Sequence, residues 1–343
     1  MATPDWDGTA SLAHPQHLVV GGLPLKVYGH PALSVPANAA PGLAVLFLLH
    51  GRGEDSNVAY ITQLATKLVE HARDHRGQVS AGASSAAQSA PARAKDLLVV
   101  TFDQRNHGHR IVEADRNASW VEPGRKRAQL REQEGRQRDN DRHAADMFAM
   151  QTGTARDVSF LIDFLAPALF PDDDRVVTDW YCSGVSLGGH ATWLALAHDP
   201  RITLGVPIIG SPSTHALLAH RAQNLPAPAG PIPLAAPYFP QSLLAAFDRL
   251  DPASPSLSLE RWRGKRILVL SGEEDQLVNF VHGKSGEFVE KLKGVEGCHV
   301  EAWVQPKAGH ACTVEMMDRT CDFVWKHGLN ASPAPTPAAG GKL

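Results

Sequence analysis

The hydrophobic positions of this 343-residue chain gather into short continuous runs, several of them followed by loops that are rich in glycine or charge. Runs of this kind without alternation are typical of strands buried on both faces of a parallel sheet. Helical stretches lie between runs, at 60–73 and 191–197. Strands that alternate with helices indicate an α/β fold. The strands that the pattern predicts are 43–49, 97–102, 176–181, 202–209, 266–270 and 298–304.

One strand-to-helix boundary carries a serine between glycines. The predicted strand at 176–181 leads into the letters G-V-S-L-G at 184–188, and the helical stretch follows. Roughly 0.1–0.2 matches to G-x-S-x-G are expected by chance in a chain of this composition, so the letters alone decide little. The strand–turn–helix setting favours a nucleophile over a serine in an ordinary glycine turn, because such a turn holds Oγ out at the end of the sheet. We therefore interpret Ser186 as a nucleophile.

Two later loops supply the partners that a serine hydroxyl needs. The predicted strand at 266–270 runs into an acidic loop that contains Asp275, and the strand at 298–304 is followed by a loop that contains His310. An imidazole can take the serine proton, and a carboxylate fixes the imidazole tautomer and stabilises its charged form. The chain order of serine, acid and histidine predicts a catalytic triad of Ser186, Asp275 and His310.

These motifs resemble the α/β-hydrolase superfamily over residues 43 to about 327. The strand at 43–49 ends in H-G-R-G at 50–53, which is similar to the family's oxyanion loop, and 103–109 is similar to its D-x-R-G-H-G signature, with Asn106 where a glycine is usual. The resemblance implies an α/β-hydrolase fold: a mostly parallel central sheet with helices on both faces and inserted cap or lid segments.

The resemblance also implies roles for particular residues. It favours Asp275 over the neighbouring Glu273 and Glu274 as the acid of the triad. It places an oxyanion hole at the backbone N–H of Leu187 and at a second N–H from the loop 50–53. We expect Arg52 to give that second donor, with Gly53 as the alternative, and His50 to brace the loop.

The domain organisation predicted from the sequence is one catalytic domain at 1–330 and a disordered tail at 331–343. Insertions are expected at about 77–95 and 106–150, and a Pro-rich cap at about 222–263. The cap segment carries enough apolar side chains to pack against the rest of the domain, although a rigid surface loop would also explain its prolines. The residues expected to line the substrate pocket are Tyr238, Phe239 and Phe247 of the cap and Trp120 of the second insertion.

Composition and charge exclude several classes of protein. A net charge of −3 gives no overall attraction for nucleic acid, and the densest charge run, 116–142, is mixed in sign. No nucleotide-binding loop follows a strand and no H-E-x-x-H cluster occurs, so we expect neither a cofactor nor a metal. No apolar run is long enough to span a membrane. The sequence indicates no particular oligomeric state.

Four cysteines without C-x-x-C spacing favour reduced thiols, and the N-terminus lacks the pattern of an export signal. We therefore expect a cytoplasmic protein. The last three residues, Gly341-Lys342-Leu343, depart from the peroxisomal S-K-L signal at the first position, so peroxisomal import is the weaker alternative.

The function that the sequence predicts is that of a cofactor-independent serine hydrolase acting on a carboxylic ester with a small or medium, largely apolar acyl group. The alternatives are an acyl-thioester hydrolase, a peptidase of the prolyl-oligopeptidase kind and a non-catalytic binding protein with a hydrolase fold. The peptidase is disfavoured because about 40 residues before the first core strand cannot form a propeller domain. The binding protein is disfavoured because no member of the triad is missing.

Overall fold

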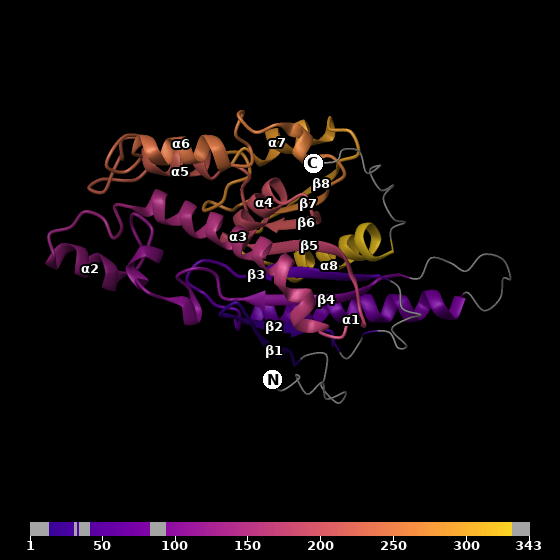
Figure 1. The fold of residues 1–343 in the computed structure, drawn as a ribbon. Helices are drawn as coiled ribbons and strands as arrows, with labels where there is room; N and C mark the ends of the chain where they lie inside the picture. Colours follow the sequence, from indigo (N-terminus) through magenta and orange to yellow (C-terminus); the bar gives the residue numbers. More distant parts are fainter. Residues whose placement is uncertain (1–13, 31–32, 34–41, 83–93, 331–343) are drawn as a thin grey trace, which may run out of the picture.

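An eight-stranded sheet organises the chain (Figure 1). The computed structural model describes residues 14–30, 33, 42–82 and 94–330. The strand order is β1-β2-β4-β3-β5-β6-β7-β8; β1 and β2 run antiparallel at one edge, and the pairs from β4 to β8 are parallel. The strands are β1 (Gln16–Val20), β2 (Leu23–Tyr28), β3 (Leu43–Leu49), β4 (Asp96–Phe102), β5 (Val177–Val185), β6 (Ile202–Ile208), β7 (Arg266–Gly272) and β8 (His299–Gln305).

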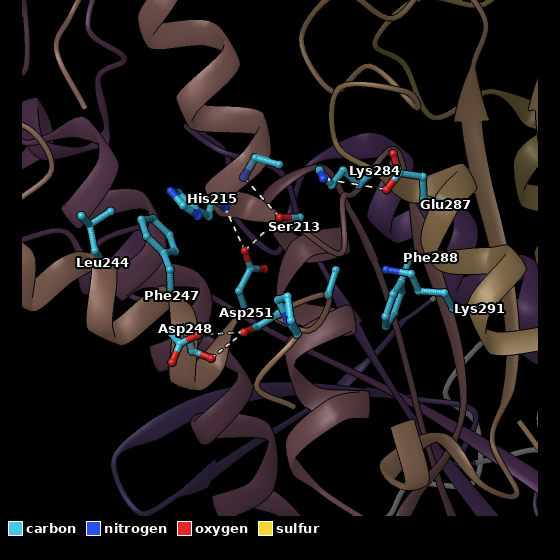
Figure 2. A pocket seen from close by; sticks show the side chains of 14 residues that line it. Ser213, His215, Leu244, Phe247, Asp248, Asp251, Lys284, Glu287, Phe288 and Lys291 are labelled. Carbon is cyan, nitrogen blue, oxygen red and sulfur yellow. Dashed lines mark hydrogen bonds and ion pairs between the residues drawn. The ribbon is translucent and has the colours of Figure 1, made fainter. Parts of the chain in front are cut away.

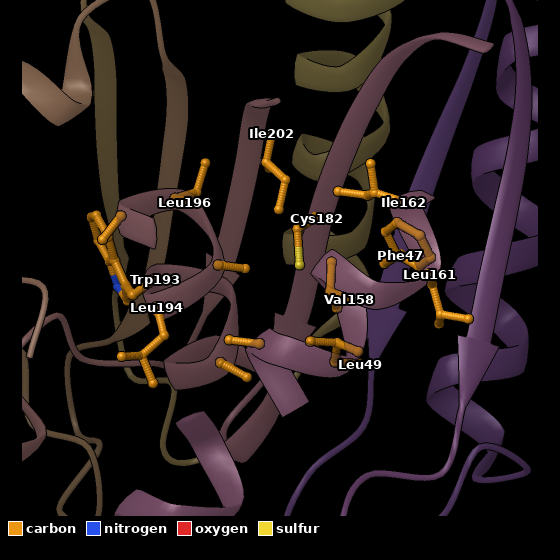
Figure 3. Close-up of a cluster of buried hydrophobic side chains, with 14 of the residues drawn as sticks. Phe47, Leu49, Val158, Leu161, Ile162, Cys182, Trp193, Leu194, Leu196 and Ile202 are labelled. Atoms are coloured by element: carbon orange, nitrogen blue, oxygen red, sulfur yellow. The ribbon is translucent and has the colours of Figure 1, made fainter. Parts of the chain in front are cut away.

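Helices cover both faces of the sheet. On one face lie α3 (His143–Leu169), α4 (Leu187–His198) and α7 (Ser285–Lys293), and on the other lie α1 (Ala59–Gly82) and α8 (Val314–Val324). All seven residues of strand β3 are apolar, because its alternate side chains pack into the helical layers on opposite faces of the sheet. Phe47 and Leu49 pack with α3 and α4, as Figure 3 shows, whereas Leu46 and Leu48 pack with α1 and α8.

Two long segments leave the sheet at the carboxyl ends of its strands. The β4–α3 segment (103–142) holds η4 (Gly108–Arg110), η5 (Ala114–Asn117) and α2 (Arg125–Gln133). The β6–β7 segment (209–265) holds α5 (Thr214–Gln223), α6 (Gln241–Leu250) and η6 (Leu259–Trp262). Figure 1 shows α2, α5 and α6 together on the left of the strands.

One arginine joins these two segments. Arg138 donates from Nη1 to the carbonyl oxygen of Ala229 at 2.6 Å and from Nη2 to the hydroxyl of Tyr238. Its guanidinium carbon lies 4.8 Å from the centre of the Tyr238 ring. The rings of Trp120 and Phe239 also meet across the boundary, with centroids 5.9 Å apart. The two segments therefore form one layer over the strand ends.

The predicted strands agree with the observed ones to within a few residues, and the α/β-hydrolase architecture is confirmed. The hairpin of β1 and β2 was not predicted. The boundary of the second insertion was wrong, because α3 begins at His143 and is a core helix rather than part of an excursion. The cap expected at about 222–263 lies inside the β6–β7 interval; residues 222–223 end α5, and Trp262 packs edge-on against Trp193 of α4 at 5.7 Å.

Two of the predicted irregular regions lie largely or wholly beyond what the structure describes. Of the insertion expected at 77–95, residues 77–82 complete helix α1, and 83–93 lie outside the described residues, as does the tail 331–343. Among the residues that are described, no helix combines the length and the apolarity needed to cross a membrane.

Candidate active site

Ser186 occupies a sharp turn between β5 and α4. Its backbone angles are φ +55° and ψ −109°, a conformation that costs a side-chain-bearing residue strain energy. The flanking glycines are required by close backbone approach. A Cβ on Gly184 would lie 2.5 Å from the carbonyl carbon of Gly188, and a Cβ on Gly188 would lie 2.4 Å from the carbonyl oxygen of Leu49. The turn therefore fits tightly between β5 and β3 and leaves the serine half-buried.

Ser186, His310 and Asp275 form a continuous chain of hydrogen bonds. The Oγ atom of Ser186 lies 2.8 Å from Nε2 of His310, and Nδ1 of His310 lies 2.8 Å from Oδ2 of Asp275. The loops that carry the acid and the histidine follow the adjacent strands β7 and β8. Gly272 lets them approach, because a Cβ there would lie 2.4 Å from the carbonyl oxygen of Ala308. The structure thus brings the three predicted triad residues together.

The carboxylate of Asp275 is held in one orientation. It is fully buried, and its Oδ1 accepts the backbone N–H groups of Leu277 and Val278, each at 2.8 Å. Burial alone would raise the pKa of Asp275. The hydrogen bond from His310 and its charge, together with these two N–H groups, outweigh burial and hold the pKa of the Asp275 carboxyl below its usual value. Asp275 is therefore a charged acceptor for the Nδ1 proton of His310.

A cavity of about 360 Å³ opens at the serine. Its wall includes Ile209, a β-branched residue at φ +44°, so strained backbone occurs both at the nucleophile and in the wall of the cavity. Tyr60 and Glu54 are wall residues that the sequence analysis missed; the Tyr60 hydroxyl donates to Glu54 Oε2 and accepts the N–H of Gly51 at 2.8 Å. The lining residues are Gly51, Arg52, Glu54, Tyr60, Val185, Ser186, Ile209, Leu277, His310, Ala311 and Cys312.

The N–H groups expected to form the oxyanion hole lie at the start of α4 and in the loop after β3. Leu187 is the first residue of α4, where a helix N–H has no intrahelical acceptor. In the loop after β3, the N–H of Gly51 is occupied by Glu54 and Tyr60. Arg52 lines the cavity and Gly53 does not. Arg52 as the second donor stays a prediction.

His50 braces this loop, as the sequence predicts. Its Nδ1 donates to the carbonyl oxygen of Gly51 at 2.8 Å, and its Nε2 accepts the N–H of Gln104 at 3.0 Å. Its own carbonyl oxygen accepts the N–H of Gly188 at 3.1 Å, which ties the loop to the serine turn. Burial lowers the pKa of His50 to about 4, so the ring stays neutral.

The departure from the family signature at Asn106 has a conformational reason. Asn106 has φ +58°, and asparagine is the side-chain-bearing residue best suited to this region after glycine. Its side chain accepts from the N–H groups of Val112 and Glu113 and donates to Asn117 Oδ1 at 2.7 Å. The asparagine thus organises the start of the β4–α3 segment.

The aromatic residues predicted for the substrate pocket are not in the wall of the Ser186 cavity. Phe239 and Phe247 are fully buried in the main hydrophobic core, and Tyr238 packs at its margin beneath Arg138. The prediction went wrong for Phe239 and Phe247 because large apolar side chains in an excursion can pack the excursion onto the core as well as face a ligand. Trp120 lines a second cavity, which adjoins the first at Leu277.

Phe247 instead lines a separate cavity of about 440 Å³ between α5, α6 and α7 (Figure 2). Asp251 lies beneath it and accepts from the N–H groups of Thr214 and His215 at 3.1 and 3.0 Å and from the Ser213 hydroxyl at 3.1 Å. Burial outweighs these donors and raises the pKa of Asp251 to about 7. The carboxyl group joins the end of α6 to the start of α5.

One group of side chains in the described residues has the composition of a metal site. His299 and Glu301 project from the edge strand β8, and His327 follows α8; their ligand atoms lie within 4.8 Å of one another. Nε2 of His299 lies 2.7 Å from Oε1 of Glu301, so the carboxylate already has a partner. None of the three lines the cavity at Ser186.

Comparison with known proteins gives a result at the level of structure. No protein-family model and no curated protein sequence match this chain. It is similar to the structure of TT1662 from Thermus thermophilus, at 19% identity over 93% of this chain and 99% of that one, with a TM-score of 0.57. It is also similar to an acylaminoacyl peptidase, at 13% identity over 94% of this chain and 42% of that one, with a TM-score of 0.55.

Together with the strand order, these similarities establish the α/β-hydrolase fold for this chain.

Proposed function

We propose that this protein is a serine hydrolase that cleaves a carboxylic ester through an acyl-enzyme. The observation that carries the proposal is the pair of 2.8 Å contacts that link Asp275, His310 and Ser186 at the wall of a cavity. This is the geometry required of a nucleophile, a base and a group that orients the base.

In the first step, Ser186 Oγ attacks the carbonyl carbon of the ester while its proton moves to His310 Nε2. Asp275 stabilises the imidazolium that forms. The N–H groups of Leu187 and Arg52 hold the negative oxygen of the tetrahedral intermediate. When the intermediate collapses, His310 gives the proton to the leaving alcohol oxygen, and the acyl group stays on Ser186.

In the second step, water replaces the alcohol. His310 Nε2 takes a proton from the water, whose oxygen attacks the acyl carbon, and Ser186 recovers its proton as the acid leaves. The strained turn at Ser186 supports this cycle because it keeps Oγ in reach of both His310 and the cavity.

A fluorophosphonate probe tests the nucleophile. The probe should label the wild-type chain once, at Ser186, and the Ser186→Ala variant should lose both labelling and hydrolysis of 4-nitrophenyl esters. Circular dichroism should show that the variant is folded. Labelling that persists in Ser186→Ala would place the nucleophile elsewhere.

The same ester panel, extended to acyl thioesters and peptide anilides, separates the alternative reactions. An acyl-thioester hydrolase would show its highest kcat/KM on the thioesters, and a peptidase would release aniline from the anilides. If the folded protein turns over none of these substrates and is not labelled, the catalytic proposal is wrong and a binding function becomes the better account.

A further inference from the structure

Arg221 presents an unmatched positive charge beside the catalytic cavity. It lies in the last turn of α5, and its Nη2 donates to the carbonyl oxygen of Leu277. Its Nε is enclosed by protein and has no acceptor, and among the described residues no carboxylate pairs with it. Arg221 as a whole is half-buried, and a half-buried guanidinium without a counter-charge is costly because burial removes part of the water that would otherwise solvate it.

Three carboxylates at or beside the catalytic cavity are already engaged, and of these Asp275 is the one that acts on the charge of Arg221. Glu122 pairs with Arg52 at 2.5 Å, Glu54 accepts from Tyr60 and Gly51, and Asp275 serves His310. Burial, together with repulsion from Arg52, lowers the pKa of Arg221 to about 10, although the charge of Asp275 acts in the opposite direction. The guanidinium remains protonated near neutral pH, and the chain supplies no anion for it in the described residues.

The neighbouring cavity has room for such an anion. It measures about 280 Å³ and is lined by Arg221 together with other polar residues, among them His220, Asn224 and Gln276. Leu277 lines both this cavity and the one at Ser186. A molecule attached to Ser186 could therefore extend past Leu277 to the guanidinium.

We propose that Arg221 binds a carboxylate of the substrate, so that the preferred ester carries a negative charge on its acyl chain or on its leaving group. This inference rests on the proposed hydrolase function and specifies its substrate class. A guanidinium and a carboxylate form paired, charge-assisted hydrogen bonds, and partial exclusion of water strengthens them. The substrate would then supply the counter-charge that the chain lacks.

Matched pairs of esters test the proposal and locate the charge. For the acyl side, 4-nitrophenyl hydrogen adipate is compared with 4-nitrophenyl hexanoate. For the leaving group, 4-acetoxybenzoate is compared with its methyl ester. The measured quantity is the ratio of kcat/KM for the charged ester to that for the neutral ester, so that general damage to the active site cancels.

In at least one pair, Arg221→Met should lower this ratio at least tenfold, and Arg221→Lys should retain an intermediate ratio because it keeps the charge. Arg249→Met is the matched control, since Arg249 is exposed on α6 and its removal changes the net charge equally. The control should leave the ratio unchanged. Ratios that stay within twofold in Arg221→Met for both pairs would overturn the proposal.

A binding measurement keeps this inference separate from the catalytic proposal. Monomethyl adipate carries one carboxylate and one ester, and the Ser186→Ala variant cannot acylate. Calorimetric titration should show binding to Ser186→Ala and at least tenfold weaker binding to Ser186→Ala/Arg221→Met. Equal affinity in the two proteins, or no binding to Ser186→Ala, would refute the carboxylate site whether or not the wild-type protein hydrolyses esters.

Discussion

Replacing Asp275 with asparagine should disable catalysis through the tautomer of His310. The Oδ1 position of Asp275 faces the N–H groups of Leu277 and Val278, and both require an acceptor. The amide of asparagine must therefore place its oxygen there and its NH₂ group toward His310 Nδ1. That nitrogen then becomes an acceptor, and the ring proton moves to Nε2, where it blocks the acceptance of the Ser186 proton.

The size of the effect on kcat follows because His310 can no longer accept the Ser186 proton. A wrong tautomer in a triad of this geometry costs about 10⁴-fold in kcat, which equals about 5 kcal/mol of transition-state stabilisation. The free energy of unfolding should change by only about 1 kcal/mol, because the two bonds from the backbone are kept and a buried charge is removed.

The assay measures kcat on a 4-nitrophenyl ester at neutral pH, with thermal unfolding as the check on folding. Glu273→Gln and Glu274→Gln are matched controls, because these acids are exposed while Asp275 is fully buried. Both controls should keep kcat within a few-fold of the wild type. The reasoning is refuted if Asp275→Asn folds and retains more than a tenth of wild-type kcat, or if either control is as damaging.

Three further outcomes are expected. Phe247→Ala should lower the free energy of unfolding by about 3–5 kcal/mol, since the ring is buried 4.4 Å from that of Phe148; a stable variant with a changed preference for acyl-chain length would contradict the core assignment. Gly188→Ala should abolish labelling by the fluorophosphonate, because its Cβ would meet the carbonyl oxygen of Leu49; full labelling would show that the turn can relax. Burial lowers the pKa of His190 to about 4, so its contribution to stability is present above pH 6.5 and is lost as the pH falls toward 4, by about 3 kcal/mol at 1.36 kcal/mol per unit. Urea unfolding at pH 7 and 4.5 should show a smaller loss for His190→Asn than for the wild type, and equal losses would remove His190 as the cause.

Local sequence patterns were sufficient to predict that the three triad residues lie close together. Ser186, Asp275 and His310 each follow a strand that the sequence predicts, and the carboxyl ends of parallel strands share one edge of a sheet. The strand β2 lacked this signal. Its buried residues alternate with more exposed ones because it lies near the antiparallel edge of the sheet, where no continuous apolar run is needed.

The substrate side of the site depends on tertiary contacts that leave no local pattern. The apolar character of Phe239 and Phe247 predicted burial correctly but could not show that the core, rather than the Ser186 cavity, covers them. The sequence analysis assigned no role to Arg221. Only the fold shows that Glu122 is paired with Arg52 and Asp275 with His310.

The contact of Arg138 with Ala229 and Tyr238 has a consequence for protein engineering. Transplanting either the β4–α3 or the β6–β7 segment alone from another hydrolase would break a junction whose two halves come from residues about 100 positions apart in the chain. The β4–α3 and β6–β7 segments should therefore be exchanged together. A library meant to change substrate preference should recombine both segments together and keep the arginine and its tyrosine from the same parent.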